Sequence, residues 1–199
     1  MSQLMFLHGP GAGACAEAVH ITDRRSSVKR AAMVLVLLLI APSSVLAWGA
    51  NGHRVVGRIA ANHLTSEAAV AVASLVGSEG LDQASTWGDE IRNDPNWQPP
   101  LKNPSPWHYI SIDDLETLET TARNPDGDVL EAIERFSAVL RDGQATRPAK
   151  QEALRFLVHF VGDVHQPLHV GRRADLGGNT VEVTLFGEKT NLHSVWDSG

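Results

Sequence analysis

Two pairs of histidine and aspartate with the same spacing are the residues of this sequence best suited to chemistry. His159 and Asp163 form the first pair, and His193 and Asp197 form the second. Residues four positions apart share one face of a helix, so an imidazole and a carboxylate could hold one divalent cation between them. A single pair of this kind is more often structural. Its repetition, with His169 close behind the first pair, predicts a cluster of metal ions.

Three further residues carry the same donor types: His53, Asp89 and His108. Zinc is bound by histidine nitrogen and carboxylate oxygen when no thiolate is available. The only cysteine of the chain is Cys15, in a segment that we expect to be removed. The donor set therefore favours zinc.

A free amino group at Trp48 would add an unusual ligand. If the chain is cleaved before Trp48, this α-amino group would have a pKa of about 7.7–8.0, low enough for a metal ion to displace the proton. The amine nitrogen and the Trp48 carbonyl oxygen could then chelate one ion, and His53 could join them. The alternative is that Trp48 is a core aromatic residue near a processed end.

The helix that must carry the first pair is marked by its apolar residues. These recur at helical spacing, as Leu154, Leu157, Val158 and Val161. The pattern predicts a largely buried helix over 149–164 that ends near Pro167, because proline cannot continue the hydrogen bonding of a helix interior.

The rest of the chain predicts a mainly α protein with a small β-hairpin. An apolar stripe of Val55, Val56, Ile59 and Ala60 predicts a helix through about Leu64. Thr65 or Ser66 is expected to cap the next helix, which ends at Gly77. Further helices are expected over 84–92 and 129–140. A loop is expected over 94–106, a short extended or irregular segment over 107–110, and a strand over 180–186 that turns at Gly187.

The first 47 residues have the character of a leader and secretory signal peptide. A basic region precedes an apolar run over 31–41, and Val45-Leu46-Ala47 resembles a cleavage site. The run is too short for a transmembrane helix. We therefore expect residues 1–47 to be removed, and residues 48–199 to form one periplasmic or secreted catalytic domain. The net charge of −6 argues against a basic nucleic-acid-binding face.

Six segments taken together resemble the S1/P1 nuclease family. They run in order through the expected mature chain as Trp48-Gly-x-x-Gly-His53, Trp87-Gly-Asp89-Glu-Ile-Arg92, Trp107-His108-Tyr109, His159-Phe-Val-Gly-Asp163-Val-His-Gln-Pro-Leu-His169, Gly177-Gly178-Asn179 and Asn191-Leu192-His193-Ser-Val-Trp196-Asp197. The resemblance implies a multi-helix fold like that of phospholipase C and P1 nuclease. It also implies C-terminal helices beyond Asp197, which we expect to be missing from this chain.

The resemblance implies three zinc ions and assigns their ligands. The first ion would be held by Asp89, His108, His159 and Asp163. The second would be held by His169, His193 and Asp197. The third would be held by the Trp48 amine and carbonyl with His53 and Asp163, so that Asp163 is shared by two ions.

The same resemblance implies a reaction and its substrates. Zinc would activate a water molecule to hydrolyse single-stranded DNA and RNA to 5′-nucleotides, with 3′-nucleotidase activity. Asp163 and Arg92 would be the catalytic residues, with Arg92 also contacting phosphate. Tyr109 would stack on a nucleobase, which an unpaired base allows. The expected protein is a monomer without stable membrane association.

Two other interpretations remain open at this point. One is a bacterial zinc phospholipase C, although Asp197 and the short spacing from Trp48 to His53 favour the nuclease. The other is an inactive, truncated zinc-binding protein.

For several other residues near these motifs, we prefer a structural role to a functional one. This preference covers His63, His165, Trp87, Trp107, Trp196, Gly177, Gly178, Asn179, Asp113 and Asp114. Asp113 and Asp114 could instead assist the nucleophilic water. For Arg172 and Arg173, contact with the substrate backbone and a solvated pair are equally compatible with the sequence.

Overall fold

A computed structural model describes residues 48–92, 94–98 and 104–199. The α-helices are α2 (Ala50–Asn62), α3 (Ser66–Val76), α4 (Gly80–Ala84), α5 (Trp87–Ile91), α6 (Val129–Arg141), α7 (Arg147–His165) and α8 (Leu192–Ser198). The 3₁₀ helices are η1 (Gly77–Glu79), η2 (Ser105–His108) and η3 (Pro167–Val170). Strands β1 (Glu182–Leu185) and β2 (Glu188–Asn191) form an antiparallel hairpin. The predicted mainly α fold with a small hairpin is confirmed. The predicted leader over 1–47 and part of the loop over 94–106 lie outside the described residues.

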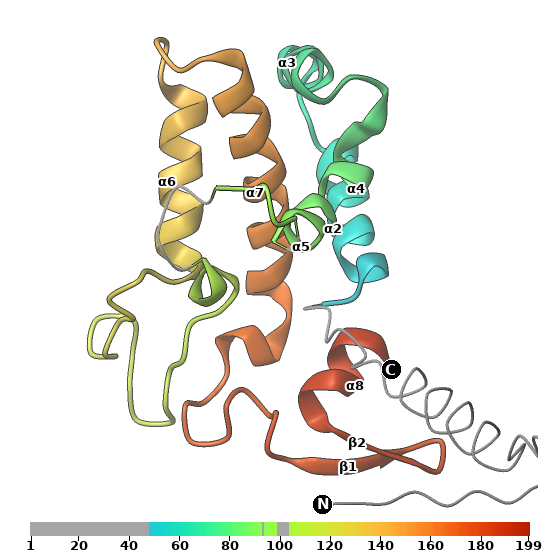
Figure 1. Cartoon of the computed structure of the whole chain (residues 1–199), viewed down its shortest axis with the longest axis vertical. Coiled ribbons are helices and arrows are strands. Elements are labelled where there is room, and N and C mark those ends of the chain that lie inside the picture. The colour runs from blue at the N-terminus through green and yellow to red at the C-terminus, as the bar shows by residue number, and fades with distance from the viewer. Residues whose placement is uncertain (1–47, 93, 99–103) are drawn as a thin grey trace, which may run out of the picture. The chain divides into compact units, whose positions relative to one another are not determined.

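Helix α7 is the element around which α2 to α6 pack, whereas α8 contacts the hairpin and η3 (Figure 1). On one side, Phe156 and Phe160 join a buried aromatic cluster with Trp107 of η2 and Phe136 of α6. On another side, its apolar residues meet those of α3 and α4 in a second buried cluster, made up of Val76, Leu81, Ala84, Leu154 and Val158. Two polar side chains of α7, those of His159 and Asp163, are fully buried as well.

Most helix boundaries follow the sequence signals. Thr65 caps α3 by accepting a hydrogen bond from the Ala68 N–H at 3.2 Å, and α3 ends at Gly77, whose φ is +64°. Helix α7 ends at His165, before Pro167, as predicted. The hairpin turns at Phe186 and Gly187, and both have positive φ.

Two predictions of local structure were wrong. The helix expected over 84–92 is divided into α4 and α5, separated at Ser85 and Thr86. Trp107 and His108 lie in η2 rather than in an extended or irregular segment. Tyr109 does have extended backbone, and Ile110 after it is buried in the aromatic cluster.

The apolar stripe predicted on α2 is divided, because Ala60 packs against the second buried cluster whereas Val55 and Ile59 face outward. Val55 and Ile59 are 57% and 55% exposed, whereas His53 and Gly57 are buried. A Cβ atom at Gly57 would lie 2.4 Å from the Leu81 carbonyl oxygen, so only glycine allows α2 and α4 to pack this closely. The buried face of α2 is therefore set by a close backbone contact and a buried imidazole rather than by its largest apolar residues.

We expect Asp128→Ala to lower the free energy of unfolding by about 2 kcal/mol, the upper end of the effect of losing a helix cap. Asp128 is 2% exposed and accepts hydrogen bonds from the Leu130 and Glu131 N–H groups at the start of α6. It also accepts two hydrogen bonds from the Arg123 guanidinium. Urea unfolding would measure the loss. Asp128→Asn, which keeps an acceptor oxygen for the cap, should lose less, and equal losses in the two variants would contradict this account.

None of the helices in the described part of the chain has the length and apolar character needed to span a bilayer.

Candidate metal centre

The predicted ligands converge on the buried end of α7. His159 and Asp163 come from α7, and the others come from α2, α5, η2, η3 and α8. Their ligand atoms form three groups in which all atoms lie within 4.8 Å of one another. The groups are His53, His159 and Asp163, then Asp89, His108 and His159, and finally His169, His193 and Asp197.

Asp163 lies at the centre of these groups and is fully buried. Its Oδ2 atom is 2.9 Å from His108 Nδ1 and 3.2 Å from His159 Nε2. Its Oδ1 atom is 3.4 Å from His53 Nε2 and 3.2 Å from His169 Nδ1. One carboxylate thus faces four imidazoles, two on each oxygen, and could bridge two cations.

Backbone carbonyls orient two of the imidazoles toward the centre. His159 Nδ1 donates to the Ser85 carbonyl at 2.8 Å, and His193 Nδ1 donates to the Gly177 carbonyl at 2.7 Å. Because a carbonyl can only accept, each Nδ1 must carry a proton, which leaves Nε2 of the neutral ring with a free lone pair. The break between α4 and α5 thus has a role, since it exposes the Ser85 carbonyl to His159.

Two pairs of histidine rings are stacked within the centre. The His53 and His159 rings are 4.1 Å apart, and the His169 and His193 rings are 5.2 Å apart. His53 also packs against the backbone of α7, where a Cβ atom at Gly162 would lie 2.6 Å from His53 Nδ1. Likewise, a Cβ atom at Gly88 would lie 2.6 Å from the His159 ring. These glycines make room for the imidazoles, a function that the sequence analysis did not assign to them.

Buried polar atoms without hydrogen-bond partners gather in this centre. Among the described residues they include both ring nitrogens of His53, Asp163 Oδ1, His169 Nδ1 and Asp197 Oδ2. Leaving one such atom unsatisfied costs about 1–3 kcal/mol. The donor set is imidazole nitrogen and carboxylate oxygen, which suits zinc. The residues present therefore fit a divalent metal, and zinc in particular.

The electrostatics of the centre keep Asp163 ionised. Burial would raise the pKa of Asp163, but the neighbouring His159 and His108 rings hold it well below its usual range. Burial would lower the pKa of His159, but the Asp163 carboxylate reverses this and raises it. The hydrogen bond to Asp197 likewise raises the pKa of His193. The Nε2 atom of each of these two imidazoles must be deprotonated before it can bind a cation.

The structure places the Trp48 nitrogen beside Asp197. This backbone nitrogen lies 3.0 Å from Asp197 Oδ1, and the Gly49 N–H donates to the Asp197 carbonyl at 2.7 Å. The sequence grouped Trp48 with His53 and Asp163 instead. Asp163 and Asp197 both contact His169, so Trp48 still lies at the edge of the same centre.

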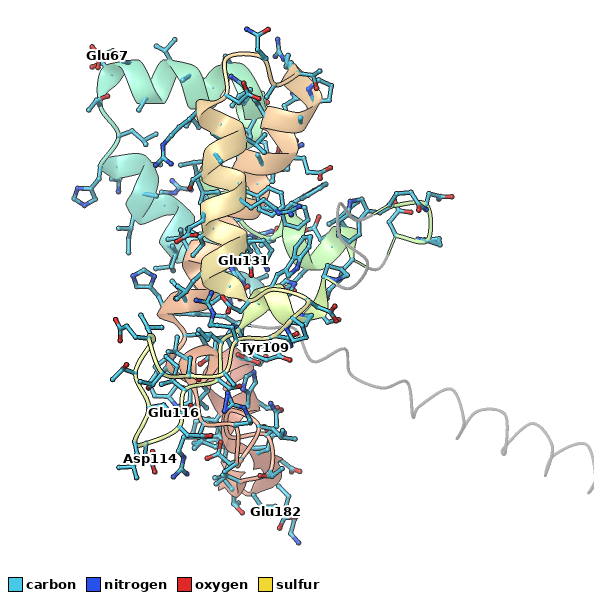
Figure 2. All side chains as sticks on the ribbon, turned by 90° about the vertical axis from the view of Figure 1, so that its left-hand side faces the viewer. Glu67, Tyr109, Asp114, Glu116, Glu131 and Glu182 are labelled. Atoms are coloured by element: carbon cyan, nitrogen blue, oxygen red, sulfur yellow. The ribbon has the colours of Figure 1, made fainter. Side chains whose placement is uncertain are left out.

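A cleft of about 680 Å³ opens directly above the centre. His108, His169 and His193 line it, together with Arg92 and Tyr109. Arg92 Nη2 lies 3.4 Å from Asp89 Oδ1. The Tyr109 side chain is 43% exposed. Figure 2 shows Tyr109 between the start of α6, near Glu131, and the loop that carries Asp114 and Glu116. The two predicted substrate-binding residues therefore share one cleft with three predicted metal ligands.

Residues 48–199 match the model of the S1/P1 nuclease family. The chain belongs to this family. It is 37% identical over 182 residues to Endonuclease 4 of Arabidopsis thaliana, covering 84% of this chain and 59% of that protein. It is 35% identical over 166 residues to Nuclease P1 of Penicillium citrinum, covering 76% of this chain and 57% of that protein. It is 30% identical over 160 residues to Nuclease S1 of Aspergillus oryzae, covering 76% of this chain and 53% of that protein. The chain therefore spans less than two thirds of the length of these relatives.

The two arginines that could have contacted substrate are engaged with carboxylates. Arg173 binds Asp113 at 3.0 Å, and Arg172 binds Asp175 at 2.7 Å and Asp114 at 3.3 Å. The Arg173 guanidinium also donates to the Ser111 and Ala122 carbonyls. These contacts join the loop after Tyr109 to the segment after η3 and so shape one wall of the cleft.

The other residues for which we preferred a structural role differ in how far they are buried. His165 is exposed and donates to the Val161 carbonyl at 2.7 Å, and His63 is exposed at the end of α2. Trp107 is 2% exposed in the aromatic cluster, which Trp87 joins from its edge. Trp196 is 53% exposed, so burial in the core does not explain this residue.

The Gly177-Gly178-Asn179 segment forms a turn, as the preferred explanation required. Both glycines have positive φ. This turn directs the Gly177 carbonyl at His193, and Gly177 and Asn179 line the cleft.

Proposed function

We propose that this chain is a zinc-dependent phosphodiesterase of the S1/P1 family that hydrolyses single-stranded DNA and RNA to 5′-nucleotides, with 3′-nucleotidase activity. The observation that carries the proposal is the buried Asp163 carboxylate facing four imidazoles, of which His108 and His169 line the cleft. Family membership supports the reaction class.

Three zinc ions would be held by the nine predicted ligands. Asp89, His108 and His159, with Asp163, would hold the first, and His169, His193 and Asp197 would hold the second. The third would be held by His53, Asp163 and the Trp48 amine and carbonyl. This last set requires a free amino group, so it rests on our inference that residues 1–47 are a signal segment removed on export to the periplasm or the medium. When bound, zinc would supply a nucleophilic water at neutral pH and a Lewis acid for the departing oxygen.

The side chains of the cleft would hold the substrate for this reaction. The Arg92 guanidinium remains charged at all relevant pH values and presents two parallel N–H groups to phosphate oxygens. Its contact with Asp89 holds the guanidinium beside the proposed ligands of the first zinc ion. An unpaired base can stack on Tyr109, whereas a base inside a duplex cannot. The cleft is therefore expected to favour single-stranded substrates. We propose that the protein acts as a monomer, without a partner chain.

One experiment tests the proposal as a whole. Zinc content and digestion of single-stranded DNA should be measured on the same sample of the 48–199 chain. Three zinc ions per chain and release of 5′-nucleotides are expected. Zinc without digestion would favour the inactive zinc-binding protein, and release of the headgroup from phospholipid vesicles would favour the phospholipase C.

We expect Tyr109→Ala to lower kcat/KM on single-stranded DNA by roughly fivefold to a hundredfold. Stacking of one base on an aromatic residue contributes about 1–3 kcal/mol by alanine substitution. Tyr109→Phe keeps the ring and should retain nearly all activity. Steady-state kinetics on an oligonucleotide would test both variants. Equal losses in the two would mean that the hydroxyl, rather than stacking, matters.

A further inference from the structure

Gln166 is a fully buried polar residue to which no function has been given so far. It follows the last residue of α7 and precedes Pro167, between the ligand-bearing end of the helix and His169. A buried carboxamide is expected to satisfy both its donor and its acceptor. Its partners therefore indicate what it does.

The two partners determine the orientation of the Gln166 carboxamide. Oε1 accepts a hydrogen bond from the Leu168 backbone N–H, which starts η3. A backbone N–H can only donate, so the oxygen must face Leu168 and the NH₂ group must face the other way. Nε2 accordingly donates to Asp197 Oδ1 at 2.7 Å. This hydrogen bond joins the end of α7 to α8, 31 residues later.

The two oxygens of Asp197 have different environments as a result. Oδ1 accepts from both Gln166 Nε2 and the Trp48 nitrogen. Oδ2 is buried without a hydrogen-bond partner and lies 3.2 Å from His193 Nε2. The oxygen that is free to bind a cation is therefore the one on the side of His193.

We propose that Gln166 is a positioning residue that occupies Asp197 Oδ1 and thereby directs Oδ2 at the cation shared with His169 and His193. This inference rests on the proposed metal centre. A carboxamide suits the role because it donates a strong hydrogen bond without adding a positive charge that would repel the cation. Partners of this kind typically change metal affinity or activity by 10- to 100-fold when they are replaced.

The test compares two substitutions at Gln166 with a matched control. Gln166→Met keeps the length of the side chain and removes both hydrogen bonds. Gln166→Glu keeps the acceptor for the Leu168 N–H, removes the donor to Asp197 and places a carboxylate against Asp197 Oδ1. Gln151→Met is the control, because Gln151 lies on α7, the helix that Gln166 follows, and donates to the Leu75 carbonyl at 2.8 Å. Gln151 belongs to none of the ligand groups.

Zinc affinity should be measured by chelator competition on wild-type and variant chains that are expressed and processed identically. We expect both Gln166 variants to bind one zinc ion roughly 10- to 100-fold more weakly, with the remaining ions unaffected. The d–d absorption of the Co²⁺-substituted protein should change for that one ion, which a general loss of stability would not produce. Gln151→Met should match the wild type in both measurements.

Three outcomes would overturn the inference. Wild-type affinity in both Gln166 variants would show that Asp197 needs no such support. Equal weakening of every ion would indicate a general structural role. Failure of the wild-type chain to bind zinc at all would instead refute the proposed metal centre itself, so the two failures can be distinguished.

Discussion

Asp163→Asn should lower nuclease activity by at least about 100-fold. Replacing a residue that only supports a metal ligand typically costs about 10- to 100-fold, and replacing a ligand itself should cost more. The substitution keeps the size of the side chain but removes the charge that faces four imidazoles. It also replaces one oxygen by an NH₂ group, which has no lone pair for a cation. The proposed ligand sets of the first and third zinc ions would both lose a member, because each would use one oxygen of this carboxylate.

Zinc content and rate should be measured together on this variant. We expect the loss of more than one zinc ion per chain, because a shared ligand is removed. Asp142→Asn is a suitable control, since Asp142 is exposed at the end of α6 and accepts a hydrogen bond from the Gln144 N–H at 2.8 Å. An Asp163→Asn variant with full zinc content and near-normal turnover would rule out a bridging role for this residue.

The sequence could predict the two pairs of histidine and aspartate because their spacing is local, whereas the other ligands were grouped with them by the family resemblance. His159 with Asp163, and His193 with Asp197, each share a helix face by the geometry of the α-helix alone. Leu154 and Val158 could be placed in the core because they recur at helical spacing, and both are buried. These inferences need no knowledge of distant contacts.

The remaining features depend on contacts between distant segments. The orientation of α2 is set by the approach of Gly57 to Leu81, which overrides the apolar stripe of Val55 and Ile59. The division of α4 from α5 is stabilised by the hydrogen bond between the Ser85 carbonyl and His159, 74 residues later. No periodicity within either segment carries that information. Gln166 was missed for the same reason, because its partner Asp197 is supplied by another helix.

The glycines that contact the histidine rings lead to a prediction that runs against helix propensity. In a helix interior, Gly→Ala ordinarily stabilises by about 0.5–1 kcal/mol. At Gly162 on α7, the added methyl group would lie 2.6 Å from His53 Nδ1. His53 cannot move aside easily, because it is fully buried and stacked on His159 at 4.1 Å. We therefore expect Gly162→Ala to lower the free energy of unfolding by about 1–3 kcal/mol, the usual effect of overpacking.

The same substitution should also reduce zinc binding, since displacing His53 removes a ligand from the group that it forms with His159 and Asp163. Thermal unfolding with and without chelator would separate the two effects, because the overpacking remains when the metal is removed. Gly143→Ala provides the matched control, as a Cβ atom there would meet nothing within 4 Å. That variant should be neutral or slightly stabilising, through the lower conformational entropy of its unfolded chain. If Gly162→Ala behaved like Gly143→Ala, His53 would not be held against α7 and could not be a preorganised ligand.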